Sequence, residues 1–339
     1  GAETPPRPVV ICGRDGNNTS RTAARGTVGQ CLSARTRGAS QRHDVPTPGP
    51  RPPMSVFAIQ LLNALQYGLL LFLVASGLTL IFGIMGIINL AHGSFYMIGA
   101  YMAFSLASLT GSLAVAMVLG VALSVILGLF LEWALFSHLY RRDHLEQVLL
   151  TYGLILIFEE LRSLVVGNDV HGVAIPPLFA GSIALGDTMT YPVYRLVMSA
   201  VCLAIAGGMY LLIQRTRLGM MIRAGASNRE MVGVLGVNVN LVFRLVFALG
   251  VALAAFAGML AAPVSSVYPG MGQHVLIICF VVVVIGGIGS VWGALAASLL
   301  IGLVDTFGKV LVPAYAGVAV YVLMAAILLW RPEGLFRRG

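Results

Sequence analysis

Two long stretches without charged residues constrain this chain more than any other feature. No Asp, Glu, Lys or Arg occurs from Met54 to Leu131, or from Leu245 to Val304. A membrane-spanning helix needs only about 20 apolar residues, so each stretch is long enough for several spans joined by short uncharged turns. Both stretches are continuously apolar rather than alternating, which favours helices over a β-barrel. The sequence therefore predicts an all-α, polytopic transmembrane helical bundle.

Composition supports this class and excludes several others. Hydrophobic residues make up 58% of the chain and charged residues only 10%, whereas about 25% of the residues in ordinary soluble domains are charged. The net charge of +8 falls to +3 when only residues 54–339 are counted. So small a charge predicts no nucleic-acid surface. The four cysteines have neither metal-ligand nor disulfide spacing, so we interpret them as packing residues.

The chain divides into two domains at residue 53. Residues 1–53 are rich in Pro, Gly, Arg, Ser and Thr and show no apolar periodicity, which predicts a disordered extension. They lack the apolar core and cleavage site of a signal peptide. We interpret them as sequence upstream of a functional protein that begins at Met54; the alternative is a basic arm that helps to hold the N-terminus in the cytoplasm. Residues 54–339 form the transmembrane domain.

Apolar segments and turn signals in the second domain predict about eight spans, some of them broken or re-entrant. The segments are 56–88, 95–109, 113–136, 148–166, 194–213, 241–262, 275–304 as a pair, and 318–330. The Arg-rich segments 138–147, 214–240 and 331–338 belong to the cytoplasm by the positive-inside rule. Segment 167–192 contains no Lys or Arg and is predicted to lie outside.

Polar residues inside the first uncharged stretch are the first candidate site. Asn89 and His92, followed by Gly93, lie in an otherwise apolar region. Polar side chains at such depth are costly unless they face other helices or a water-filled path. We therefore expect them either to line a translocation path or its gate, or to make hydrogen bonds that hold helices together.

Glu159 and Glu160 lie near the end of a predicted span, beside Arg162. Acidic groups at such a position serve either in proton coupling or as solvated charges at the level of the lipid headgroups. We favour solvated charges, because the oppositely charged arginine is so close.

Small residues mark two places where helices are expected to come close. Gly250, Ala254, Gly258 and Ala262 recur at every fourth position, a spacing that lets another helix approach. The second place is a glycine-rich turn in the sequence GGIGSVWG, which contains Gly286, Gly287, Gly289 and Gly293. For both groups of glycines we expect close packing or a hinge.

The charged segment 214–240 contains a short helix signal. Ser227 and Glu230 have the spacing of a capping box, in which each side chain bonds to the other residue's backbone amide. Met231, Val234 and Leu235 then fall on one face, and Gly236 is suited to end the helix. So short a helix is marginal in water. Its apolar face therefore rests either on a partner or on the lipid headgroups.

No catalytic group of residues is present in the sequence. The phosphate-binding pattern GxxxxGK[ST] is missing, so this chain is not expected to hydrolyse ATP by that route. Neither HExxH nor paired cysteines indicate a metal. The sequence thus predicts no catalytic residue, no metal and no cofactor, and a protein that is not an enzyme.

Four separated segments together resemble a known family. They are NLAHGSFYMIGAY (89–101), TRLGMMIRAGASNREMVGVLGVNV (216–239), VVVIGGIGSVWGALAASLLIG (282–302) and RPEGLF (331–336). The chain from Met54 to Phe336 resembles the smaller permease subunit of branched-chain amino acid ABC importers. Two features depart from the family pattern: the first 53 residues, and Val232, where the family usually has a small residue.

The resemblance implies a function and a set of partners. A cytoplasmic helix of such a permease docks in a cleft of an ATP-binding subunit, and the matching residues here are Arg223, Ser227, Asn228, Glu230, Met231, Leu235 and Gly236. The implied partners are a second, non-identical permease, two ATP-binding subunits and a periplasmic substrate-binding protein, all at a bacterial inner membrane. The implied substrates are Leu, Ile and Val; the alternatives are an ABC permease for urea or short amides, and a gradient-driven secondary transporter.

Overall fold

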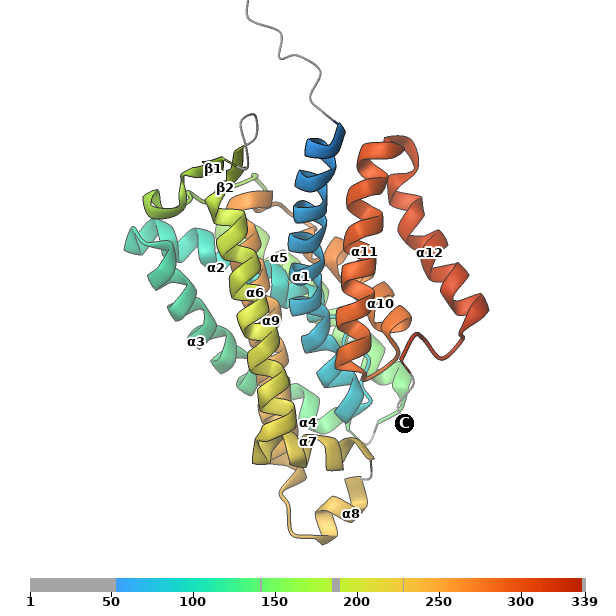
Figure 1. Ribbon diagram of the computed structural model, residues 1–339. Coiled ribbons are helices and arrows are strands. Elements are labelled where there is room, and N and C mark those ends of the chain that lie inside the picture. Colours follow the sequence, from blue (N-terminus) through green and yellow to red (C-terminus); the bar gives the residue numbers. More distant parts are fainter. Residues whose placement is uncertain (1–52, 141, 185–189, 228, 337–339) are drawn as a thin grey trace, which may run out of the picture. The chain divides into compact units, whose positions relative to one another are not determined.

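The computed structural model describes residues 53–140, 142–184, 190–227 and 229–336 (Figure 1). These residues are almost entirely helical, and the only sheet among them is an antiparallel pair, β1 (Ser182–Ala184) and β2 (Thr190–Pro192). The predicted all-α fold is therefore confirmed. The extension predicted for residues 1–53 lies outside the described residues, apart from Pro53.

Long helices account for most of the described chain. They are α1 (Pro53–Met85), α2 (His92–Thr110), α3 (Leu113–Leu131), α5 (His144–Val166), α6 (Val193–Arg215), α9 (Val239–Ser265), α10 (Met271–Gly286), α11 (Val291–Leu311) and α12 (Ala316–Trp330). Short elements connect them: the π-helical turn η2 (Glu132–Phe136), α4 (Ser137–Leu139), α7 (Arg217–Ser227), α8 (Arg229–Val234), and the 3-10 turns η3 (Pro177–Phe179) and η4 (Pro313–Tyr315).

Six helices of the described chain are long and apolar enough to cross a membrane, namely α1, α3 with its continuation to Leu139, α6, α9, α11, and α12 with its preceding turn. The predicted number of about eight spans is thus slightly too high. Three further long helices belong to the bundle but are polar or short: α2 begins with His92, α5 carries four charged residues, and α10 has 16 residues.

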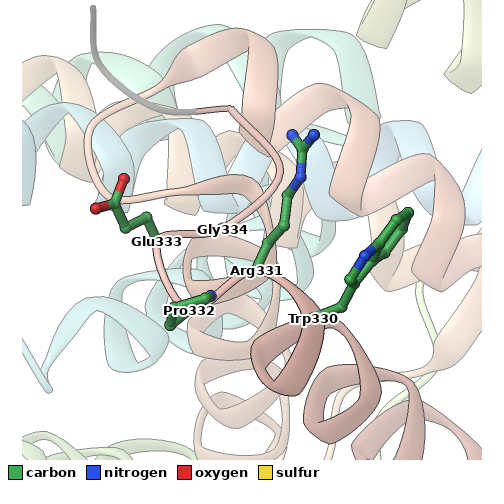
Figure 2. A pocket seen from close by; sticks show the side chains of 5 residues that line it. All are labelled: Trp330, Arg331, Pro332, Glu333 and Gly334. Atoms are coloured by element: carbon green, nitrogen blue, oxygen red, sulfur yellow. The ribbon is translucent and has the colours of Figure 1, made fainter.

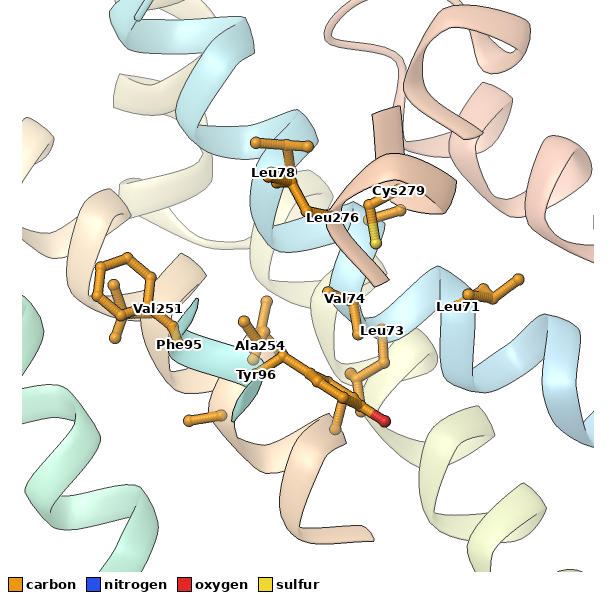
Figure 3. Close-up of a cluster of buried hydrophobic side chains, with 14 of the residues drawn as sticks. Leu71, Leu73, Val74, Leu78, Phe95, Tyr96, Val251, Ala254, Leu276 and Cys279 are labelled. Carbon is orange, nitrogen blue, oxygen red and sulfur yellow. The ribbon is translucent and has the colours of Figure 1, made fainter. Parts of the chain in front are cut away.

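Helices α1 and α9 form the centre of the bundle. The protein buries 89% of the span window of α1 and 83% of that of α9, but only 17% of those of α6 and α12. Helix α1 packs against α9, α10 and α11, and α9 packs against α2 and α3. Figure 3 shows the core where these helices meet, with Leu73 and Leu78 of α1 close to Tyr96 of α2 and Leu276 of α10. The outer helices therefore leave apolar sides exposed beyond the core.

The two ends of the bundle are chemically different. At one end, the hairpin end, the side chains of Tyr191 and Arg195 donate to Asn63 Oδ1 at 3.2 and 2.8 Å, which places the start of α1 beside β2. The opposite end carries α4, α7 and α8 (Figure 1) and is called the Arg-rich end below. Helix α1 therefore runs from the hairpin end, the predicted outer side, towards the Arg-rich end.

Candidate functional site

Helices α2 and α9 cross so closely that their backbones touch. A Cβ atom added at Gly258 would run into the carbonyl oxygen of Tyr96, and one added at Gly99 would run into that of Ala255. Glycine removes the atoms that would keep two membrane helices apart. The stripe predicted from Gly250 to Ala262 thus supplies one side of this crossing, and Gly99 on α2 supplies the other.

Two more glycine pairs extend the contact to α1 and α10. A Cβ atom on Gly77 of α1 would lie 2.7 Å from the carbonyl oxygen of Gly250, and one on Gly93 of α2 would run into that of Gly272 in α10. Four helices therefore meet by direct backbone contact around the start of α2. Any displacement of one of them has to move the others or break these contacts.

His92 lies at the point where these helices meet and is completely buried. Its Nε2 atom lies 3.0 Å from the carbonyl oxygen of Val74, in the middle of α1. A carbonyl oxygen only accepts, so Nε2 must donate the hydrogen bond. The other ring nitrogen, Nδ1, has no hydrogen-bond partner among the described residues. The Nδ1 edge of this imidazole is thus available for a further polar contact.

Asn89 is completely buried as well and lies just before α2. Its Oδ1 atom accepts from the backbone amide of Ala91 at 3.1 Å, whereas Nδ2 has no partner among the residues that the structure describes. Asn89 and His92 therefore each have one buried hydrogen-bonding atom without a partner among the described residues.

Asn89 lies in the connection between α1 and α2. Helix α1 ends at Met85, and residues 86–91 are not helical. Val74 lies 11 residues before the end of α1, so the chain climbs back roughly 16 Å into the bundle before α2 begins. Non-helical backbone at such depth is tolerated only where protein or a water-filled cavity surrounds it.

At the Arg-rich end, α7 and α8 project from the bundle (Figure 1). The exposed fractions of Met231, Val234 and Leu235 are 59%, 83% and 75%, whereas Val232 is buried. Gly236 has φ of 82° and ends the helix in the left-handed conformation, as expected. The apolar face predicted for this short helix therefore points away from the protein's own core. Val232, the residue that departs from the family pattern, points towards it.

Arg223 is exposed and also makes a hydrogen bond within the chain. Its Nη1 atom donates to the carbonyl oxygen of Ile213, near the end of α6, so it binds an otherwise unpaired helix-end carbonyl. The predicted capping box cannot be compared in the same way. Asn228 and the side chains of Ser227 and Glu230 lie outside the described part of the chain, and their hydrogen bonds stay a prediction.

The glycine-rich turn joins α10 to α11 and packs tightly against itself. A Cβ atom on Gly286 would lie 2.5 Å from the carbonyl carbon of Gly293. Ser290 Oγ accepts from the amide of Gly293 at 3.0 Å and so caps α11. Gly287 and Gly289 have φ of 93° and 75°, values that L side chains rarely adopt. All four predicted glycines thus meet a conformational or packing demand of this turn.

The C-terminal motif RPEGLF binds the end of α10. The amide of Leu335 donates to the carbonyl oxygen of Ile285 at 2.8 Å, and a Cβ atom on Gly334 would lie 2.7 Å from Gly287. Figure 2 shows the open pocket next to this contact, lined by residues Trp330 to Gly334. None of the predicted path residues lines it. The RPEGLF motif and the glycine-rich turn, which lie far apart in the sequence, are therefore in direct contact.

Sequence reasoning missed a buried ion pair. Glu132 has a fully buried side chain, and Arg244 Nε donates to its Oε2 at 2.9 Å. The residues are 112 positions apart. The available signal was their place in the sequence: Glu132 ends the first uncharged stretch, and Arg244 immediately precedes the second.

The interpretation of Glu159 and Glu160 as solvated charges does not fit Glu159, which is largely buried in an ion pair with Arg162. The side chains of Arg162 and Glu159 are only 9% and 20% exposed and form an ion pair of 3.2 Å. Arg162 also donates to the carbonyl oxygen of Gly167 at 2.7 Å. The helix end folds back over these groups, and periodicity alone does not reveal that. Glu160 is exposed, as expected.

Comparisons with known proteins point to one family. A family model described as branched-chain amino acid transport system / permease component matches residues 60–329. The chain is 33% identical over 294 residues to the high-affinity branched-chain amino acid transport system permease protein BraD of Pseudomonas aeruginosa, covering 82% of this chain and 95% of that protein. It is 30% identical over 299 residues to the corresponding permease protein LivH of Escherichia coli K12, covering 83% and 96%.

More distant similarities extend beyond these bacteria. A probable branched-chain amino acid transport permease protein of Methanocaldococcus jannaschii is 28% identical over 295 residues, which cover 80% of this chain and 90% of the relative. Among solved structures, PsaBC from Streptococcus pneumoniae in complex with Fab matches with a TM-score of 0.45 and 13% identity, over 79% of this chain and 89% of that one. That structural similarity is too low to support an argument.

Proposed function

The chain belongs to the family of branched-chain amino acid transport permease components, and on that premise we propose that it is a permease subunit of an ATP-driven importer of Leu, Ile and Val. It is a multi-pass membrane protein with six apolar helices of spanning length among the described residues. We place it in a bacterial inner membrane, with the Arg-rich end in the cytoplasm.

The exposed apolar face of α8 is the observation that carries this proposal. Val234 and Leu235 are 83% and 75% exposed at the predicted cytoplasmic end, where water rather than lipid would surround them. Exposed apolar groups that cluster at such a place mark a contact with another protein. We assign this face to an ATP-binding subunit, with Ser227, Asn228, Glu230, Met231 and Gly236 as further coupling residues. Arg223 supports the site by fixing α7 to the end of α6.

The polar groups at the start of α2 are our candidates for the translocation path or its gate. Asn89 and His92 each have one unused hydrogen-bonding atom, and Gly93 lets α10 approach. A gate needs polar atoms that find different partners in the inward-open and outward-open states. Gly250 and Gly258 give α9 its close contacts with α1 and α2, and Gly286, Gly287, Gly289 and Gly293 form a packed turn that serves as a hinge.

The geometry suggests how the movement of α8 would reach the path. Helix α9 begins at Val239, directly after α8, and touches α1 and α2 by backbone contacts. A closing pair of ATP-binding subunits would shift α8 and the base of α9. Because α9 cannot slide past Gly77 and Gly99 without losing these contacts, the shift would change the packing around His92.

The family implies the remaining components. We propose a second, non-identical permease, two ATP-binding subunits and a periplasmic substrate-binding protein as partners. ATP hydrolysis would take place in the ATP-binding subunits, since this chain carries no phosphate-binding loop of the GxxxxGK[ST] pattern.

Uptake of labelled leucine into vesicles that contain the complete complex tests the proposal. ATP is supplied and both the proton and sodium gradients are collapsed. We expect uptake to persist and to compete with isoleucine and valine. Uptake that disappears with the gradients would contradict the ATP-driven mechanism. If the binding protein stimulates ATP hydrolysis but no leucine enters, the assignment of Leu, Ile and Val as substrates is wrong, and urea or a short amide is favoured.

A further inference from the structure

A buried ion pair joins the inner ends of the two uncharged stretches. Glu132 ends α3 at the Arg-rich end, and Arg244 lies in the second turn of α9. Arg244 Nε donates to Glu132 Oε2 at 2.9 Å, while part of the arginine side chain remains exposed. Tyr140 donates its hydroxyl to the other carboxylate oxygen, Oε1. Both oxygens of this buried carboxylate therefore have a partner.

The backbone around Glu132 is unusual. The amide of Ser137 donates to the carbonyl oxygen of Glu132, five residues earlier, which makes η2 a π-helical turn. Such turns are frequent at functional sites, because they displace side chains from the regular helical positions. Here Glu132, Phe136 and Tyr140 all contact α9: besides the ion pair, Phe136 packs on Phe247 at 4.4 Å and Tyr140 on Phe243 at 5.0 Å between ring centroids.

A continuous series of ring contacts leads from this pair to the candidate gate. Phe247 also packs against Phe95 of α2 at 6.1 Å, and Phe95 lies 6.4 Å from the ring of His92. Phe247 and Phe95 are both buried. The base of α9, which follows α8 directly, is thus in packed contact with the η2 turn on one side and with the start of α2 on the other.

Stability alone is a weak reason for such a pair. Apolar residues of similar volume often stabilise a protein as well as a buried ion pair or better, because they need no desolvation of charge. A charge-assisted hydrogen bond is directional, however, and fixes one relative placement of two helices. The pair at residues 132 and 244 therefore specifies how the base of α9 sits against the end of α3.

We propose that Glu132 and Arg244 are positioning residues for energy coupling, which hold the base of α9 against η2 so that movement of α8 reaches His92. This inference rests on the proposed function. Without the pair, the first turns of α9 yield when α8 moves, and the packing at Phe95 and His92 does not change. ATP would then be hydrolysed with less substrate transported.

The neutral double variant Glu132→Gln with Arg244→Gln separates this role from a purely structural one. The single variant Arg244→Gln leaves an unpaired buried carboxylate and is expected to assemble poorly. The double variant has no unpaired charge, so its assembly recovers. We expect its leucine uptake per ATP hydrolysed to fall by at least about fivefold, the lower end of usual coupling between sites.

A second ion pair of the bundle provides the matched control. Lys309 Nζ lies 2.6 Å from Asp305 Oδ2, and both residues belong to α11, four positions apart, so the ion pair itself does not join two helices. Lys309 also lies over the ring of Tyr67 in α1, 5.6 Å from its centroid, but it is not part of the contact between η2 and α9. The double variant Asp305→Asn with Lys309→Gln removes the same number of charges. Its uptake per ATP is expected to stay within about twofold of the wild type, as for substitutions without a shared partner.

The experiment uses the complete complex in proteoliposomes and measures assembled complex, labelled leucine uptake and phosphate release. If the wild type takes up leucine and the 132/244 double variant transports as much leucine per ATP as the wild type, the inference is overturned and the proposed function stands. An equal loss in the 305/309 control would overturn it too, because any lost ion pair would then suffice. Absence of ATP-driven uptake in the wild type would overturn both.

Discussion

Two regions of the molecule differ in what they bury. One is the crossing of α1, α2, α9 and α10, and the other is the projecting α7–α8 segment. At the crossing, glycines bring backbone against backbone and the polar side chains are completely buried. In α8, a helix of six residues, Met231 and Val234 are more than half exposed, as is Leu235 directly after it. The first region is completed by the chain itself, whereas the second exposes the apolar face that we assign to a partner. A substitution should therefore damage folding in the first region and coupling in the second.

The largest effect is expected from Gly258→Leu. The new side chain would collide with the backbone of Tyr96, and neither helix can move away without losing other contacts. We expect a loss of more than about 3 kcal/mol, enough to remove most of the assembled protein. The measurement is the amount of complex recovered by size-exclusion chromatography.

Gly207→Leu in α6 is the control for that variant, since nothing lies within 4 Å of a Cβ atom at Gly207. Normal recovery of this control would assign the effect to the crossing rather than to glycine replacement in general. Normal recovery of Gly258→Leu would contradict the close packing described above.

His92→Leu should have the next largest effect. It removes the hydrogen bond to Val74, whose carbonyl oxygen keeps its helical bond within α1, and the loss of one such bond costs about 0.5–1.5 kcal/mol. We expect the protein to be recovered in reduced amount. We also expect leucine uptake per recovered complex to fall by about tenfold, because a gate contact worth about 1.4 kcal/mol changes an equilibrium by that factor.

His274→Leu provides the comparison for His92, because His274 is exposed. Its uptake should be that of the wild type. If His92→Leu lowers recovery but not uptake per complex, the residue is a packing group and not part of the gate.

Leu235→Ser tests the second region. Because Leu235 is 75% exposed, the variant should change the free energy of unfolding by no more than about 0.5 kcal/mol. Loss of a central apolar contact of an interface costs more than about 1 kcal/mol of binding. We expect normal recovery of the chain together with loss of the ATP-binding subunit during purification.

Leu145→Ser replaces a leucine that is 70% exposed near the same end of the bundle, at the start of α5. We expect it to keep the ATP-binding subunit. Equal loss of that subunit in both variants would mean that α8 is not the specific contact.

The smallest effect is expected from Ser227→Ala with Glu230→Ala. A lost helix cap costs about 1 kcal/mol, which loosens the start of α8 without removing its apolar face. Insertion should be normal, and uptake per ATP should fall by a few-fold. Unchanged ATP-driven uptake would refute the coupling role assigned to these two residues.

Much of the architecture follows from the sequence, and its departures have physical causes. The uncharged stretches predicted membrane-spanning helices, some of them broken, and the structure places one such break at residues 86–91. The predicted number of about eight spans was slightly too high, because it counted the segments of α2, α5 and α10, which are not among the six helices long and apolar enough to cross a membrane. The exposure of Glu159 was misjudged, because its burial depends on an ion pair with Arg162 that has no periodic signature.

The candidate sites show the same division. Gly236 and the apolar face of α8 were predictable, because helix ends and helix faces depend on residues a few positions apart. The contact between the RPEGLF motif and the glycine-rich turn was not predictable from spacing. Each motif is recognisable alone, but nothing in its own sequence specifies the other as a neighbour.

The sequence by itself determined that this chain is a helical membrane protein, where its polar exceptions lie, and which short helix leaves the bundle. These properties depend on local composition and on the cost of placing charge and unpaired backbone groups in lipid. Only the tertiary structure decided that Gly258 meets Tyr96, that His92 bonds to Val74, and that Glu132 pairs with Arg244. Such pairings depend on the three-dimensional crossing of helices, which brings Gly258 and Tyr96 together although they are 162 positions apart.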